Sequence, residues 1–475
     1  MKMVKSLLLG TAAGLVALSG AQAADLPVKA KPVQYVKICS LYGAGFYYIP
    51  GTDTCIKIGG FVRAEVNGNA GGSFSVIQNG SVEGGNLQPS LETWRTRALV
   101  SLDARSQTEY GTLRAYFDMA TTETNGQAGG GGAANGAGVG NNPGGSGAGP
   151  YTRLWSNAAF IQLAGFTVGK TASLFDFDLQ PYSNQTNFWS SNYGGAGIDV
   201  WAYTAQFGNG LSATLSAEQP AARRMSITAS PITYGAAAAP ALTGTEQYGN
   251  QQVPDIVANL RVDQSWGSAQ VMGAYHQLIA TSSGAPSPAL ATNRDSAWAG
   301  GAGVKVNLPM IGHGDYAIVQ ANYSDGVLSY AGQGINGGFN VTNVDATVHS
   351  IGPAVDAVLV GTSLDKTKAW SVTGGVEHFW NGKWKSSLFG AYGEVRYSDN
   401  ASAVLAGGVA PFPSANWAFG QIGSRTVWTP VPNLDVSLEV MYNSLKTAQS
   451  FNPALPVEDK NWVSGIFRVQ RNFYP

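Results

Sequence analysis

The sequence predicts an all-β, transmembrane antiparallel barrel of about sixteen strands. Two observations support this prediction: long runs of strict apolar–polar alternation, and short and long connections that take turns between them. The clearest example is residues 92–119, two alternating runs around a short polar turn. In the first run, Trp94 and Val100 share one face, whereas Arg95 and Arg97 share the other. Such alternation places successive side chains on opposite faces of a strand.

The length of these runs favours a membrane barrel over a soluble sandwich. Strands of soluble proteins usually have five or six residues, whereas these run to about eleven, enough to cross a bilayer at a tilt. A face rich in arginine also suits the wall of a water-filled lumen.

The composition agrees with one large sheet. The chain has 475 residues with 62 glycines, 12% charged residues and 11% aromatic residues. This aromatic content argues against disorder, despite the low charge and high glycine content. The net charge of −1 argues against a strongly basic nucleic-acid-binding protein, so we expect no nucleic-acid partner.

Three segments are expected along the chain. Residues 1–23 have the pattern of an export signal: Lys2 and Lys5 precede an apolar core, and cleavage is expected after Ala23. Residues 24–54 should form an extended segment and a disulfide-closed hairpin, and residues 55–475 the barrel. No later run of 18 apolar residues occurs, so the sequence predicts no transmembrane helix.

The mature chain contains two cysteines, Cys39 and Cys55. Export to an oxidising compartment favours a disulfide between them. A disulfide that closes a loop of this size stabilises the folded state by roughly 3 kcal/mol in the chain-entropy model. Two free thiols or a metal site remain alternatives.

The alternation continues through the chain and gives sixteen strands joined by eight long and seven short connections. The expected strands are 55–67, 92–105, 110–119, 153–164, 165–171, 198–208, 210–219, 255–264, 266–278, 296–307, 314–325, 368–380, 383–397, 415–429, 433–446 and 461–473. The glycine-rich connection 126–149 reads as a flexible loop. The connection 173–197 is rich in aromatic residues and should pack against another part of the protein.

Several long strings resemble the alphaproteobacterial general porins, outer-membrane proteins of sixteen strands. They are ADLP after the cleavage site, YVKICSLYGAGFYYIPGTDTCIKIGGFVRAE, the hairpin RTRALVSLDAR–TEYGTLRAYF, and RVQRNF near the end. The resemblance implies a homotrimer in the outer membrane of a Gram-negative bacterium. It also implies a third long loop that folds inward into the barrel and narrows it, and passage of ions and small hydrophilic solutes. Lipid, lipopolysaccharide and the barrel-assembly machinery would be its other partners. Porins of this type commonly end on an aromatic residue used for assembly, and we expect Phe473 to take that role.

A basic cluster and an acidic loop are the candidate pore constriction. We expect the basic side at similar mid-depth on three successive strands, with Arg95 slightly nearer the outer rim: Arg63, Arg95, Arg97 and Arg114. Arg97 and Arg114 would face Asp176 and Asp178 of the third loop, and opposed charges of this kind screen solutes. The alternatives are that the arginines are unrelated solvated residues, and that the aspartates pair locally and anchor the loop.

No catalytic, metal-binding or cofactor-binding residues are expected. The four histidines are isolated in sequence and lack metal-ligand spacing. The sequence therefore predicts a water-filled diffusion channel. A solute-selective channel on the same barrel is the nearest alternative, and a barrel enzyme or adhesin is the alternative from a different class.

Overall fold

The computed structural model describes residues 37–68, 92–124, 151–184, 189–191, 197–228, 232–233, 241–242, 245–249, 251–281, 293–332, 339–342, 349–407, 414–449 and 458–473. The expected export signal, its cleavage after Ala23 and the glycine-rich connection 126–149 lie outside these residues.

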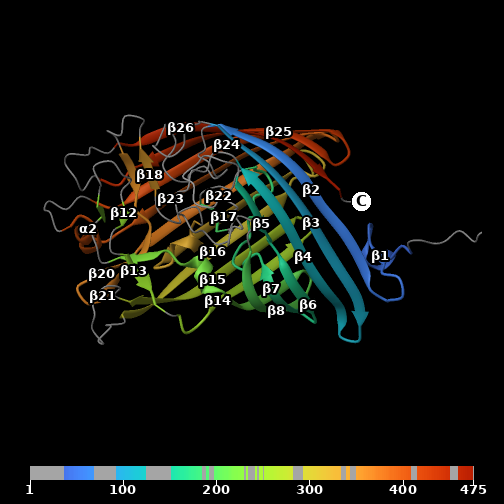
Figure 1. The fold of residues 1–475 in the computed structure, drawn as a ribbon, viewed down its shortest axis with the longest axis horizontal. Coiled ribbons are helices and arrows are strands. Elements are labelled where there is room, and N and C mark those ends of the chain that lie inside the picture. The colour runs from blue at the N-terminus through green and yellow to red at the C-terminus, as the bar shows by residue number, and fades with distance from the viewer. Residues whose placement is uncertain are drawn as a thin grey trace, which may run out of the picture.

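The described residues form one closed antiparallel barrel, which confirms the predicted all-β barrel (Figure 1). Its wall consists of β2 (Cys55–Gly68), β3 (Glu92–Thr108), β4 (Gly111–Thr124), β5 (Tyr151–Trp155), β6 (Ala159–Leu163), β7 (Phe166–Thr171), β8 (Ile198–Gly208), β9 (Leu211–Glu218), β14 (Asp255–Gln264), β15 (Gly267–Thr281), β16 (Asn293–Asn307), β17 (Tyr316–Asp325), β22 (Lys368–Asn381), β23 (Trp384–Arg396), β24 (Trp417–Val431), β25 (Leu434–Lys446) and β26 (Lys460–Asn472). Because β5 and β6 both pair with β4, they form one interrupted strand, and the wall has sixteen strands.

Pairing of the first and last strands closes the sheet. Glu65 of β2 lies opposite Arg468 of β26, and the Phe473 backbone N–H donates to the Gly60 carbonyl at 3.0 Å. Closure leaves no open edge among the wall strands, which a bilayer requires because an unpaired backbone group is costly in hydrocarbon. Short turns connect the strands at one end of the barrel and long connections at the other.

The fourth predicted strand, 153–164, is interrupted in the structure. The Asp118 carboxylate accepts hydrogen bonds from the backbone N–H groups of Asn157 (2.7 Å) and Ala158 (3.3 Å). In the stretch between β5 and β6, these bonds replace the backbone pairing with β4. A buried acidic side chain on the inner face of β4 thus explains why the strand is broken.

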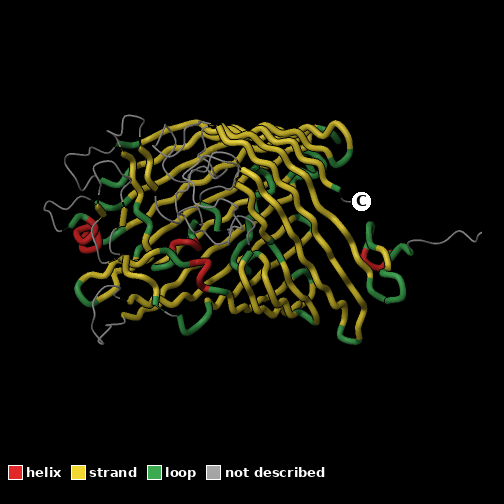
Figure 2. The backbone as a smooth tube through the Cα atoms, in the orientation of Figure 1, coloured by secondary structure: helices red, strands yellow, loops and turns green. Residues whose placement is uncertain are grey.

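The long connections contain further structure that alternation did not predict. In addition to the wall strands, the chain forms η3 (Pro220–Arg223), β10 (Ser226–Thr228), β11 (Ile232–Thr233), β12 (Ala241–Leu242), β13 (Thr245–Tyr248), η4 (Leu328–Tyr330), β18 (Phe339–Thr342), β19 (His349–Gly352), β20 (Val355–Val360), β21 (Ser363–Lys366) and α2 (Asp399–Leu405). Figure 2 shows α2 at the end of the barrel opposite β1. Within the described residues, no helix is both long enough and apolar enough to cross a membrane.

A small hairpin lies at the short-turn end of β2. It contains η1 (Ser40–Tyr42) and β1 (Tyr47–Tyr48), which pairs with the first residues of β2. The predicted disulfide between Cys39 and Cys55 is present, and both cysteines are buried with Phe46. The covalent bond therefore fastens this hairpin to the barrel wall.

Candidate pore constriction

The two faces of the barrel wall differ sharply in polarity. Large apolar side chains are exposed on the outer face, including Val62, Phe117 and Leu388. The opposite face carries buried polar residues such as Gln320 and Asn443. An apolar exterior and a polar interior are typical of a barrel with lipid outside and water inside.

Arg63 and Arg97 lie directly opposite each other on β2 and β3. The Arg63 Nε–H donates to Gln470 Oε1 at 2.6 Å. The Arg97 Nε–H donates to Thr122 Oγ1 at 3.0 Å, and its guanidinium lies 4.6 Å from the centre of the Trp155 ring. Two like charges directly opposite each other on neighbouring strands repel. Together, the two guanidinium groups give this part of the inner wall a positive potential.

Two residue pairs nearer the long-loop end, Glu65 bridges two further arginines. Its carboxylate lies 2.6 Å from Arg95 and 2.5 Å from Arg468 on the two neighbouring strands. The Glu65 side chain has no exposed area. Four arginines and one glutamate give this part of the wall a net charge of +3. The bridge places Arg95 in the same cluster as Arg63 and Arg97.

The expected depth of Arg114 is wrong. Arg114 lies opposite Arg105 and not Arg97, and Arg105 is eight residues, or about 27 Å along the strand, closer to the short-turn end of β3. There it pairs with Asp103, with Arg114 Nη2 at 3.0 Å from Asp103 Oδ2. The tight turn between β3 and β4 fixes this register. Arg97 is far from that turn and Arg114 is next to it, so the two cannot share a depth.

Residues 173–184 and 189–191 contact the polar face of the wall across many strands. At the start of this segment, Ser173 Oγ–H donates to Glu218 at 2.6 Å, and the Leu174 carbonyl accepts from Asn259 Nδ2 at 2.6 Å. Further along, the Asp178 N–H donates to Gln320 Oε1 at 2.7 Å. These partners lie on β9, β14 and β17, across the barrel from β2 and β3 in the order of pairing.

Asn184 connects this segment to the arginine cluster. Its backbone carbonyl and side-chain oxygen accept from Arg468 at 2.7 and 2.9 Å. Its backbone N–H donates to Glu439 Oε2 at 2.5 Å, and its side-chain N–H donates to Ser437 Oγ at 2.9 Å. Because Arg468 also binds Glu65, the segment and the basic wall belong to one hydrogen-bonded network.

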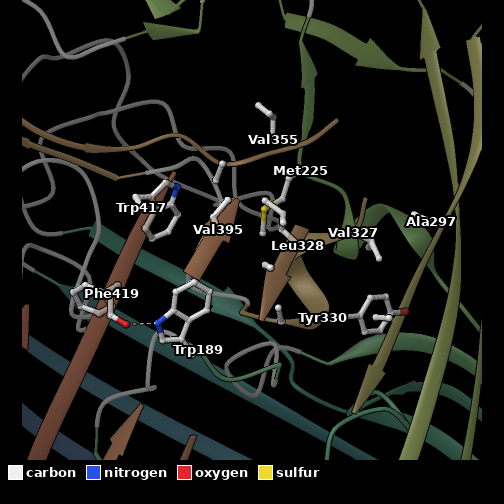
Figure 3. Close-up of a cluster of buried hydrophobic side chains, with 14 of the residues drawn as sticks. Trp189, Met225, Ala297, Val327, Leu328, Tyr330, Val355, Val395, Trp417 and Phe419 are labelled. Carbon is white, nitrogen blue, oxygen red and sulfur yellow. Dashed lines mark hydrogen bonds between the residues drawn. The ribbon is translucent and has the colours of Figure 1, made fainter. Parts of the chain in front are cut away.

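Aromatic packing stabilises both described parts of the segment. Trp189 is wholly buried, its ring stacks on that of Trp417, and its indole N–H donates to the Phe419 carbonyl at 2.7 Å (Figure 3). Tyr182 packs its ring against Phe389. The aromatic content of this connection therefore reflects packing, as the sequence predicted.

Asp176 and Asp178 have partners of their own. The Asp176 carboxylate lies 3.4 Å from the buried Arg223 guanidinium, and Asp178 accepts from the Tyr182 hydroxyl at 2.5 Å. Burial raises the pKa of Asp176 to about 6 against the effect of Arg223, and burial also raises the pKa of Asp178. The expectation that these carboxylates face Arg97 and Arg114 needs correction. Both side chains are buried against loop and segment residues, which favours the alternative of local pairing.

Sequence reasoning did not select several residues of the site. Arg425 donates to the Pro181 carbonyl at 2.8 Å and lies 2.7 Å from Glu377, while Arg223 and Asn184 anchor the segment as described above. Arg425 lies on the polar face of β24, so the alternation of the sequence could have identified it as a residue of the inner wall. Arg223 and Asn184 lie in connections without a period, where no local pattern marks a contact.

A closed barrel with a polar, charged interior and an apolar exterior defines a channel protein of a membrane. The porin subfamily model matches residues 25–466, and the chain belongs to this family. Porin Omp2b of Brucella suis biovar 1 (strain 1330) is 33% identical over 286 residues, which cover 58% of this chain and 67% of that protein.

One solved structure shares the fold, and a second gives a weaker match. The outer membrane channel DcaP of Acinetobacter baumannii matches with a TM-score of 0.58 and 16% identity, covering 90% of this chain and 99% of that chain. OmpT of Vibrio cholerae, in its trimer form, matches with a TM-score of 0.45 and 8% identity, covering 89% and 100%. Family membership makes the chain a porin of the Gram-negative outer membrane, a channel for passive diffusion and not an enzyme.

Proposed function

We propose that this general porin has a constriction with a basic side formed by Arg63, Arg95 and Arg97. The main support is the pair of like charges at Arg63 and Arg97 within a group of net charge +3. A fixed positive potential attracts anions and repels cations in a narrow aqueous passage. The channel should therefore pass small hydrophilic solutes and prefer anions over cations.

Residues 173–184 and 189–191 supply the other boundary of this constriction. Their contacts with Gln320 of β17 and Arg425 of β24 support a position against the inner wall that runs from the side across the lumen towards the basic side. Such a position narrows the aqueous passage. Asp176 and Asp178 then anchor the segment, through Arg223 and Tyr182, and do not form an acidic side of the filter.

Arg114 contributes to solute passage at a second depth. Together with Arg105 it shares the carboxylate of Asp103, which leaves one net positive charge near the short-turn end. An anion leaving the constriction would meet this second, weaker positive site before the periplasm.

Planar-bilayer recording tests the proposed function. The protein should give steady ohmic conductance, and its reversal potential in a potassium chloride gradient should show anion preference. A general porin should conduct without saturation by a solute, whereas a solute-selective channel should show saturable block. Absence of steady conductance by correctly folded protein would contradict the channel, and cation preference would contradict the basic constriction.

We infer that the chain assembles as a homotrimer, as its family membership suggests. Unheated protein should migrate as a high-mass band in mild detergent gels and convert to the monomer on boiling. A monomer after gentle extraction would contradict this inference.

We further propose that residues 1–23 are removed on export. We also propose that the barrel-assembly machinery recognises Phe473. The Phe473 ring lies over Gly60, where an added Cβ would come within 2.4 Å of a ring carbon. Replacing Phe473 by alanine should lower the yield of heat-modifiable barrel in cells. A normal yield would assign the assembly signal elsewhere.

A further inference from the structure

Two aromatic rings lie side by side on the inner face of the barrel, on the short-turn side of the proposed constriction. Tyr116 of β4 and Phe160 of β6 are partners in the sheet, and their rings stack with centres 5.2 Å apart. Their neighbours in sequence, Phe117 and Ile161, are exposed on the outer face, so alternation turns the stacked pair inward. Both stacked side chains are half-buried, and their accessible surface therefore faces the water of the lumen.

The stacked pair adjoins the second basic site. The Arg114 guanidinium lies 5.4 Å from the centre of the Tyr116 ring and 5.1 Å from that of the Phe160 ring. Tyr116 lies opposite Asp103, which is six residues, or about 20 Å along β3, from Arg97. The rings therefore belong to the second basic site and are separate from the constriction.

The second basic site keeps both charge and hydrogen-bond donors for an anion. Arg105 and Arg114 share the carboxylate of Asp103, so one net positive charge remains. The side chains of both arginines are 27% exposed. Within the part of the chain that the structure describes, three of the five N–H groups of Arg114 donate to Asp103 and Gln162, which leaves two for a ligand.

We propose that Tyr116, Phe160 and Arg114 form a lumenal binding site for small aromatic carboxylates. The stacked rings offer an apolar surface against which a further planar ring packs. The guanidinium binds a carboxylate through charge-assisted hydrogen bonds in the same small region. The inference names a solute class for the proposed channel and therefore rests on the proposed function.

The same combination of groups occurs at the constriction. The Arg63 guanidinium lies 4.5 Å from the centre of the Phe61 ring, and that of Arg97 lies 4.6 Å from the centre of the Trp155 ring. A planar anion that leaves this level therefore meets similar chemistry at the next depth. Conduction requires several weak sites along a passage, so that a solute can enter one and leave for another. A neutral sugar could pack against the rings but would make no use of the net positive charge, so the arrangement favours an anion.

Block of the potassium chloride current by benzoate in planar bilayers tests the proposal. Cyclohexanecarboxylate is the reference solute, because it has the same charge and a ring of the same size that is not aromatic. Benzoate should half-block the parental channel at a concentration roughly tenfold lower than cyclohexanecarboxylate does. The variant Tyr116→Ser/Phe160→Ser should lose this difference. The matched control Tyr110→Ser should keep it, because Tyr110 is an exposed tyrosine on the turn between β3 and β4.

Equal block of the parent by the two acids would overturn the proposal, and this comparison does not depend on the folding of any variant. A double variant that keeps the difference, or a control that loses it, would overturn the proposal as well. Arg114→Gln should weaken block by both acids to a similar extent, and unchanged block would show that Arg114 does not bind the carboxylate.

The reversal potential of the parent in a potassium chloride gradient, without either acid, tests the constriction separately. Cation preference in that measurement would contradict the basic constriction. A tenfold preference for benzoate in the same channel, lost on replacing Tyr116 and Phe160, would still support the aromatic carboxylate site.

Discussion

Replacing Arg63 by glutamine should shift the channel towards cations without breaking the barrel. Arg63 is suited to this test because its side chain donates to a neutral partner, Gln470. Arg95 and Arg468 instead both contact the buried carboxylate of Glu65, so their removal would remove part of its compensation. The substitution lowers the local net charge from +3 to +2.

The size of the shift can be worked out from this change of one charge. A unit charge about 7 Å from a passing monovalent ion contributes about 0.6 kcal/mol in water, and about half of that at 0.1 M salt. Anions lose this energy and cations gain it, so the anion-to-cation permeability ratio should fall by roughly threefold. The effect should weaken as salt rises, because screening becomes stronger.

Reversal potentials in a potassium chloride gradient measure this ratio directly. Arg471→Gln is the matched control, since Arg471 is an exposed residue of β26 that donates to the Pro432 carbonyl away from the cluster. The control should keep the parental ratio. If folded Arg63→Gln protein also keeps it, Arg63 does not form part of the filter.

Four further variants test the stability and the packing of the protein. Glu65→Gln should lower the free energy of unfolding by about 3 kcal/mol, because it leaves two arginines without their buried carboxylate; an unchanged urea midpoint would contradict the bridge. Burial raises the pKa of Asp176 from 3.8 to about 6, so the folded protein takes up a proton between about pH 4 and 6 that the unfolded chain does not bind. Acidification from pH 7 to 5 should therefore stabilise the fold by about 1 kcal/mol through this group, and Asp176→Asn should remove that increment from the pH dependence of the urea midpoint. Cys39→Ser with Cys55→Ser should destabilise the terminal hairpin by about 3 kcal/mol, seen as faster proteolysis there, and the native cysteines should resist alkylation until reduced. Trp189→Ala should lower the stability of the packed segment by about 3 kcal/mol, and the channel should then admit larger sugars in a liposome swelling assay. An unchanged size limit would show that Trp189 does not help to set it.

The wall of the barrel could be predicted because one physical rule governs it. Each strand separates lipid from water, so alternation of side chains reports both its location and its facing. Val62 and Phe117 face outward as the sequence indicates, and Arg63 and Arg97 lie on the polar face. The interrupted fourth strand escaped prediction because its cause, Asp118, lies on the neighbouring strand and acts through tertiary contacts.

The error on Arg114 has a different origin, since the sequence did contain the necessary information. In an antiparallel hairpin, depth follows from the number of residues to the turn rather than from position within a run. Counting from the turn at residues 109–110 pairs Arg114 with Arg105 and Arg97 with Thr122. The partners of Asp176 and Asp178 were a harder problem, because Arg223 and Tyr182 lie in irregular connections that carry no period.

The arrangement around Glu65 explains how a dense group of arginines can be tolerated in the wall. A buried carboxylate between Arg95 and Arg468 offsets part of the repulsion that Arg63 and Arg97 create. Arg468 extends this compensation to the segment by donating to two oxygens of Asn184. A displacement of the segment would remove acceptors from Arg468 and change the field at the constriction. At the proposed constriction, we therefore expect the width of the passage and its charge to be coupled through Arg468.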